Sequence, residues 1–176
     1  KVSIITISYN SAETIEDTIK SVVSQDYPNI EYIIIDGASK DATLSIVDKY
    51  KDKIAKVVSE KDKGIYDAMN KGVQNATGDI IGILNSDDYY YDTTVISEVV
   101  RLFEQEKTDG LYADLVYVDR ADSEKIIRYW KSGKYTHGKF LKGWMPPHPT
   151  FFVKKEVYTH FGLYKWESKL MQTLVI

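Results

Sequence analysis

The chain has 176 residues, with 23 Lys and Arg against 26 Asp and Glu and a net charge of −3. This length suits one domain of about 100–200 residues, and the 43% apolar content excludes a disordered chain. The near-balanced charge excludes the overall basic footprint of nucleic-acid-binding proteins, and the absence of Cys excludes disulfides and thiolate chemistry. We therefore expect one domain over residues 1–176 that binds no nucleic acid.

The first half of the chain alternates short apolar runs with segments of helical periodicity. The apolar runs predict strands at 2–8, 32–35, 54–58 and 79–84. The periodic segments predict helices at 15–23, 44–50, 65–73 and 95–103. Asn10, with Glu13 three residues later, resembles a capping box at the start of the first helix. Such alternation favours an α/β domain with a mainly parallel sheet flanked by helices.

The alternation of predicted strands and helices ends after Gly110. Residues 111–118 and 126–130 are strand-like with no crossover helix between them, which predicts antiparallel or mixed additions to the sheet. Three prolines within residues 145–149 indicate a constrained loop. A short strand at 151–153 and a short helix at 154–160 follow. We see no internal repeat and no linker between domains.

Polar side chains follow three of the predicted strands. Tyr9 and Asn10 come after the first strand, Asp36 after the second, and Asp87 and Asp88 after the fourth. In open α/β sheets, ligands bind beyond the carboxyl ends of the strands, so these groups are candidates for one site. Each could alternatively be an ordinary turn or helix cap, where Asp, Asn and Ser are common.

The adjacent carboxylates of Asp87 and Asp88 repel each other, and a hard divalent cation would relieve that repulsion. Zinc is not expected, because the chain has no Cys and three scattered histidines. One of these, His148, is held between two prolines, where either a structural or a catalytic role is open. The charged loop before Gly64 leads into a helix whose start could attract an anion or simply be solvated.

Several enzyme classes lack their motifs here. No Gly-rich dinucleotide-binding turn follows the first strand, and the chain has neither a phosphate-cradling Gly-Lys-Ser/Thr loop nor a Gly-x-Ser-x-Gly nucleophile elbow. Instead, the ordered motifs resemble those of family 2 glycosyltransferases, which have the GT-A fold, an α/β architecture with a Rossmann-like first half. The motifs that carry the resemblance, over about residues 1–164, lie at 2–10, 24–25, 35–43, 60–72, 76–79, 84–88, 148–152 and 161–164.

The resemblance implies roles for five of these side chains in binding a nucleotide-sugar donor. Tyr9 would lie against the base and Asp36 would hydrogen-bond it, while Asp67 would face the donor site. Asp87 would point toward the ribose or the sugar, and His148 would lie at the acceptor and diphosphate end.

A metal and a reaction type follow from the same resemblance. Asp88 would coordinate Mn²⁺ or Mg²⁺ bridging the donor diphosphate. The expected activity is metal-dependent, inverting transfer of a sugar from a UDP-linked donor to a hydroxyl acceptor. Its expected setting is bacterial cell-surface polysaccharide biosynthesis.

The chain departs from the family pattern after about residue 164, so we expect a truncated or altered C-terminal end. Glu167 is the one acid there, and it is a weak match to the family's general base. A non-catalytic nucleotide-sugar-binding domain is therefore the alternative. A sugar-phosphate nucleotidyltransferase is a third reading, but no Gly-rich basic loop follows the first strand.

The same reasoning gives expectations for location and partners. With no signal-peptide pattern, and because nucleotide sugars are made in the cytosol, we expect a cytoplasmic enzyme at the inner face of the plasma membrane. Its acceptor would be a saccharide or a lipid-linked saccharide, which would allow peripheral membrane contact. An exposed sheet edge or the strands within 111–130 could form a homodimer.

Overall fold

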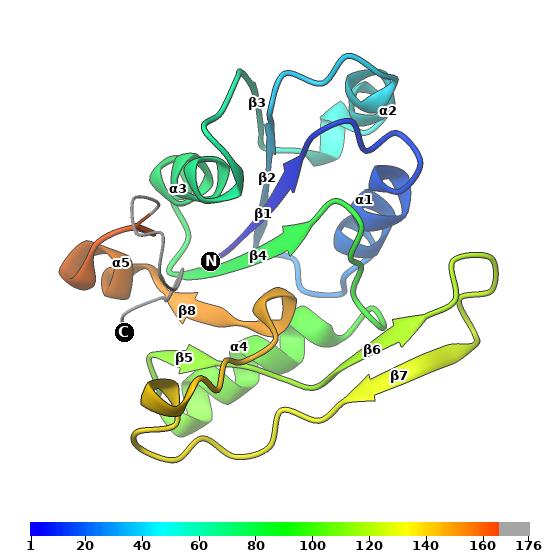
Figure 1. Ribbon diagram of the computed structural model, residues 1–176. Helices are drawn as coiled ribbons and strands as arrows, with labels where there is room; N and C mark the ends of the chain where they lie inside the picture. Colours follow the sequence, from blue (N-terminus) through cyan, green and yellow to red (C-terminus); the bar gives the residue numbers. More distant parts are fainter. Residues whose placement is uncertain (166–176) are drawn as a thin grey trace.

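A six-stranded sheet forms the centre of the computed structural model, which describes residues 1–165 (Figure 1). Four strands in the order β3, β2, β1 and β4 are parallel, and β8 joins antiparallel to both β4 and β5. In sheet order, the strands are β3 (Lys56–Ser59), β2 (Ile30–Asp36), β1 (Val2–Ser8), β4 (Ile80–Asn85), β8 (Phe152–Lys154) and β5 (Gly110–Leu111).

Helices cover both faces of this sheet (Figure 1). On one face lie α1 (Ile15–Val23), α2 (Thr43–Asp48) and α4 (Val95–Glu106), and on the other lie α3 (Ile65–Asn75) and α5 (Lys155–Phe161). Short 3₁₀ turns are η1 (Lys51–Lys53), η2 (Phe140–Lys142) and η3 (His148–Thr150). Among residues 1–165, no helix is long and apolar enough to cross a bilayer.

Side-chain alternation along the central strands divides the apolar core between the two faces. In β1, Ile4 packs in the cluster under α1, α2 and α4, whereas Ile5 and Ile7 pack under α3 and α5. Each strand buries both sides, which explains why the sequence shows continuous apolar runs there. A Cβ atom at Gly72 would overlap the side chain of Ile5, so glycine allows α3 to lie directly on β1.

The strands and helices predicted for residues 1–106 are confirmed to within a few residues, but the capping box is wrong. Helix α1 begins at Ile15 after Thr14, without a side-chain cap. Asn10 has a left-handed φ of +49°, and its side-chain oxygen accepts a hydrogen bond from the Lys40 N–H at 2.9 Å. The loop after β1 therefore uses Asn10 to contact the loop after β2.

The prediction that residues 111–118 and 126–130 extend the sheet is largely wrong. Only β5 joins it, while β6 (Leu115–Val118) and β7 (Ile126–Trp130) pair with each other as a separate antiparallel hairpin. Figure 1 shows this hairpin alongside the central sheet, with its turn pointing away from it. Most of β7 is exposed. It pairs with β6, and this pairing does not bury its side chains.

The strand order places a topological switch point beside β1. The chain passes from β1 to β2 and β3 on one side, then crosses back to β4 on the other side. Ser8 pairs with Asp36, and Ile7 pairs with Asn85, so the three strands end at nearly the same level. The loops after β1, β2 and β4 are thus brought to the edge where such sheets bind ligands.

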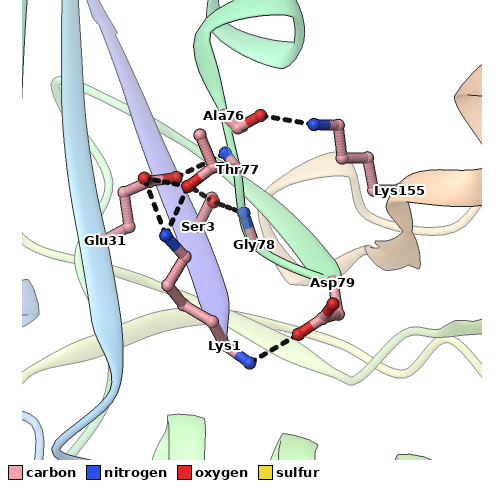
Figure 2. A network of polar contacts seen from close by, with 8 residues as sticks. All are labelled: Lys1, Ser3, Glu31, Ala76, Thr77, Gly78, Asp79 and Lys155. Carbon is pink, nitrogen blue, oxygen red and sulfur yellow. Dashed lines mark hydrogen bonds and ion pairs between the residues drawn. The ribbon is translucent and has the colours of Figure 1, made fainter.

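The opposite edge of the sheet is fastened by a hydrogen-bond network around Glu31 (Figure 2). Its carboxylate accepts hydrogen bonds from the Ser3 hydroxyl at 2.5 Å, the Thr77 N–H at 2.6 Å and the Lys1 ammonium at 3.1 Å. Burial acts to raise the pKa of Glu31, but hydrogen bonds from Ser3, Thr77 and Lys1 outweigh it and lower the pKa from 4.5 to about 2. The ionised carboxylate therefore stabilises the fold.

We expect Glu31→Gln to lower the free energy of unfolding at about pH 7 by about 1–3 kcal/mol, because the charged acceptor is lost. Since the pKa of Glu31 is lower in the folded state, this stabilisation is complete above pH 4.5 and disappears as the pH falls toward about 2. Urea unfolding at a series of pH values measures it. A difference between wild type and variant that stays constant or grows on acidification would contradict this assignment.

Candidate functional site

The loops after β1, β2 and β4 are hydrogen-bonded to one another. The Asn10 N–H donates to the Ser39 hydroxyl at 2.8 Å, in addition to the Asn10–Lys40 hydrogen bond. The hydroxyls of Ser11 and Ser86 lie 2.7 Å apart, which connects the loop after β1 with the loop after β4. The carboxyl edge of the sheet therefore presents a connected set of loops.

Asp36 is the buried acid beneath these loops, with 0% of its surface exposed. One carboxylate oxygen accepts from the hydroxyls of Ser8 at 3.2 Å and Ser39 at 2.5 Å, and the other accepts from the Ser39 N–H at 2.9 Å and the Ser59 hydroxyl at 2.7 Å. A carboxylate offers about four acceptor positions, so all are in use. Asp36 thus positions the loops, and its hydrogen bond to a base stays a prediction.

Tyr9 lies on the surface directly above, with 63% of its area exposed. A Cβ atom on Gly37 would come 3.2 Å from the Tyr9 ring and 2.6 Å from a carboxylate oxygen of Asp62. The absence of a side chain at Gly37 therefore lets the Tyr9 ring and the Asp62 carboxylate approach it from two directions. Together the three residues offer an exposed aromatic face beside a hydrogen-bond acceptor.

The loop after β4 carries the paired acids. Asp87 is exposed, whereas Asp88 is half-buried and accepts a hydrogen bond from the Asn85 side-chain amide at 2.8 Å. Burial raises the pKa of Asp88, the Asn85 hydrogen bond lowers it, and the charge of Asp87 raises it further. Thr18 of α1 donates to the Asp88 carbonyl at 2.8 Å, which fixes this loop against the helix.

His148 reaches the same edge of the sheet through η3. Strand β8 is antiparallel to β4 and pairs Phe152 with Gly82, so the residues before β8 extend along β4 toward Asn85. The Nε2 atom of His148 and the Oδ1 atom of Asn85 are both buried without a hydrogen-bond partner in the described part of the chain. Burial lowers the pKa of His148, which favours the neutral ring. Unpaired buried polar atoms are costly, so each of these two is a candidate partner for a bound water or a ligand.

Asp67 lies in the first turn of α3. Its carboxylate accepts from the Lys63 N–H at 2.9 Å and lies 3.4 Å from the Lys71 ammonium. The hydrogen bond from Lys63 is the main cause that lowers the pKa of Asp67. Asp67 therefore holds the loop before α3, and its predicted orientation toward a donor is not decided by these contacts. The predicted base candidate, Glu167, lies outside the described residues.

Asp62 and Asn85 are the site residues that sequence reasoning missed. Both stand inside motifs that were recognised, at 60–72 and 84–88, but no role was assigned to them. The structure adds the proximity of Asp62 to Gly37 and the buried, unpaired amide oxygen of Asn85. The sequence signal for Asp62 is its place two residues before Gly64, because Asp favours such turns. In the structure its carboxylate accepts a hydrogen bond from the Gly64 N–H at 3.0 Å.

A pocket also lies at the opposite edge of the sheet. Its wall includes Tyr27, Ile80, Phe103 and Lys154, and it contains none of the predicted site residues. The candidate site at the carboxyl edge is thus separate from this pocket.

A comparison with protein families identifies the family to which the chain belongs. The sequence pattern described as glycosyl transferase family 2 matches residues 3–160 of the chain. The chain belongs to glycosyl transferase family 2. The matched region contains Tyr9, Asp36, Asp62, Asp88 and His148, so the candidate site lies within the family domain.

Two curated relatives illustrate the sequence similarity. WfaP of Escherichia coli, a UDP-Glc:alpha-D-GlcNAc-diphosphoundecaprenol beta-1,3-glucosyltransferase, is 40% identical over 68% of this chain and 47% of its own length. TuaG of Bacillus subtilis, a putative teichuronic acid biosynthesis glycosyltransferase, is 41% identical over 49% of this chain and 36% of its own length. The chain thus spans less than half the length of these relatives.

Solved structures agree on the fold. TarS of S. aureus (residues 1–349) in complex with UDP has a TM-score of 0.75 at 21% identity, over 98% of this chain and 52% of that one. The mannosyltransferase PcManGT of Pyrobaculum calidifontis, in complex with GDP-Man and Mn²⁺, has a TM-score of 0.70 at 21% identity, over 93% of this chain and 47% of that one. The GT-A fold expected from the sequence is confirmed.

Replacing Asp36 tests its positioning role. We expect Asp36→Ala to lower the free energy of unfolding by about 2–4 kcal/mol, because it leaves the hydroxyls of Ser8, Ser39 and Ser59 without their charged acceptor. Urea unfolding measures the loss, with Asp52→Ala, an exposed acid of η1, as the control. An Asp36→Ala variant as stable as the control would contradict the positioning role.

Proposed function

We propose that the chain transfers a sugar from a UDP-linked donor to a hydroxyl acceptor, with a divalent metal and with inversion at the anomeric carbon. The observation that carries this proposal is that two groups of side chains lie at the same edge of the sheet. One is the exposed ring of Tyr9 beside the Asp62 carboxylate. The other is the half-buried acid Asp88 in the same part of the fold as the unpaired polar atoms of Asn85 and His148. Family membership supplies the reaction class, and the site supplies the residues.

The base of the donor would bind at Tyr9. Its exposed ring offers a face on which a pyrimidine can stack, and the absence of a side chain at Gly37 lets the Asp62 carboxylate lie close to that ring. The carboxylate of Asp62 accepts hydrogen bonds, and a uracil ring donates one from its N3–H. The crystal structure of TarS with UDP supports a uridine nucleotide on this fold.

The diphosphate and its metal would bind beyond β4. Among residues 1–165, no group of three His, Asp or Glu side chains is placed to enclose an ion, so a fully protein-bound metal does not fit. Mg²⁺ is commonly held by one or two carboxylates together with substrate phosphates and water, and Asp88 fits that pattern. The half-buried carboxylate of Asp88 would gain a counter-charge, and Asp87 would face the ribose or the sugar. A bound Mn²⁺ or Mg²⁺ supplies Lewis-acid stabilisation of the leaving diphosphate.

Transfer also requires a base for the acceptor hydroxyl. Inversion in one displacement needs the hydroxyl to attack from the face opposite the leaving diphosphate and to lose its proton as it does so. The neutral His148 ring and the Asn85 amide oxygen would lie at the diphosphate end and orient the donor and acceptor by hydrogen bonding. Glu167 remains the candidate base from sequence, in the part of the chain that is not described.

The acceptor class is inferred from the relatives. The name of WfaP specifies an undecaprenol-linked saccharide as acceptor, and TuaG is named as a putative teichuronic acid biosynthesis glycosyltransferase. We therefore place this chain in bacterial cell-surface polysaccharide biosynthesis, acting on a saccharide or a lipid-linked saccharide from the cytoplasmic side.

Calorimetric titration with UDP tests the donor and metal assignments together. We expect UDP to bind in the presence of Mn²⁺, and binding to weaken about tenfold or more in Asp88→Ala, because a charged metal ligand is lost. Tyr9→Ala should weaken UDP binding with or without Mn²⁺, since it removes stacking area alone.

The control is Asp52→Ala, which removes an exposed carboxylate from η1, outside these loops, and should bind UDP as the wild type does. UDP binding that is indifferent to both Mn²⁺ and Asp88→Ala would contradict the metal assignment. UDP binding without any sugar transfer to a lipid-linked acceptor would instead favour the non-catalytic binding domain.

A further inference from the structure

The positive charge of the chain is concentrated in one segment. Residues 125–155 contain eight Lys and Arg and no Asp or Glu, although the whole chain has a net charge of −3. Outside this segment the chain has 15 basic against 26 acidic residues. The basic residues of the segment are Lys125, Arg128, Lys131, Lys134, Lys139, Lys142, Lys154 and Lys155.

The same segment exposes large apolar side chains. Leu141 of η2 has 93% of its surface exposed and Ile127 of β7 has 63%. Four more exposed apolar or aromatic side chains lie within residues 126–145, namely Ile126, Tyr129, Tyr135 and Met145. We call residues 126–145 the basic rim. Figure 1 shows it running along one edge of the molecule, from the β6–β7 hairpin to η2.

Three cations of the basic rim, Arg128, Lys131 and Lys139, lie over aromatic rings. The Arg128 guanidinium lies 5.4 Å from the centre of the Tyr117 ring, and the Lys139 ammonium lies 5.0 Å from that of Trp144. Within residues 1–165, no carboxylate forms an ion pair with the cations at 128, 131, 134, 139 and 142. Such rings hold a cation at the surface without neutralising it.

This combination matches the chemistry of an anionic bilayer surface. Lys and Arg are attracted to anionic headgroups, Trp and Tyr favour the headgroup level, and exposed aliphatic chains gain by entering the acyl boundary. We propose that the basic rim docks the protein on an anionic lipid bilayer. The proposal rests on charge and exposure, and it holds whether or not the donor assignment is correct.

Other occupants fit these observations less well. A second copy docked through the same surface would bring two positively charged faces together, which is unfavourable. A nucleic acid would bind the cations, but its phosphate backbone has no apolar surface on which the exposed Leu141 could be buried. A bilayer uses both kinds of side chain.

The hairpin whose second strand begins the basic rim also contacts a loop of the candidate site. Arg120, in the turn of the β6–β7 hairpin, pairs with Glu13 in the loop that follows β1. Docking through the hairpin would therefore bring the carboxyl edge of the sheet toward the membrane surface. A lipid-linked acceptor would then meet the donor site without leaving the bilayer.

Vesicle co-sedimentation tests the proposal. We expect the wild type to bind vesicles of mixed phosphatidylglycerol and phosphatidylcholine, and not vesicles of phosphatidylcholine alone. Lys134→Glu/Lys142→Glu should reduce the bound fraction about tenfold or more, by replacing attraction with repulsion at two sites. Leu141→Ser should reduce it severalfold while leaving the charge unchanged.

The matched control is Lys51→Glu/Lys53→Glu, which makes the same charge change in η1, away from the basic rim, and should bind vesicles like the wild type. Circular dichroism and the UDP titration check that each variant is folded. Absence of wild-type binding to anionic vesicles, or an equal loss in the control, would overturn the proposal. So would binding to soluble polyglutamate as strong as binding to vesicles, with neither affected by Leu141→Ser.

Discussion

The buried carboxylate of Asp36 holds the functional edge of this protein together. It receives four hydrogen bonds from Ser8, Ser39 and Ser59, which belong to three different segments of chain. A buried charge is tolerated only when it is fully paired or hydrogen-bonded, so these bonds constrain the ends of β1, β2 and β3 strongly. Tyr9 and Asp62 sit above this arrangement, and their approach to Gly37 depends on it.

The candidate site divides into two parts on either side of β1. Tyr9 at the end of β1 lies beside Gly37 and Asp62 from the loops after β2 and β3, whereas the loop after β4 and the turn before β8 carry Asp88 and His148. This division follows from the strand order, since the chain reverses direction across the sheet between β3 and β4. A nucleotide diphosphate has the same division into a flat apolar end and a charged end. Under the proposed function, each part of the site would contact one end of such a ligand.

The sequence predicted the central sheet well because strands buried on both faces leave continuous apolar runs, as in β1 and β2. It failed for β6 and β7, where alternating patterns indicate strands but not their partners. The site was predictable as a set of strand-end residues, with Tyr9, Asp36 and Asp88 meeting at one edge. That Asp36 is enclosed while Asp62 is presented beside Tyr9 could not be predicted, because both depend on how separate loops pack.

A crystal structure with UDP and Mn²⁺, with anomalous scattering used to locate the metal, tests whether these two parts of the site bind one nucleotide. We expect a manganese peak at the Asp88 carboxylate and the uracil ring stacked on Tyr9. A nucleotide bound in the pocket at the opposite edge, beside Tyr27 and Phe103, would contradict it. So would a metal bound away from Asp88.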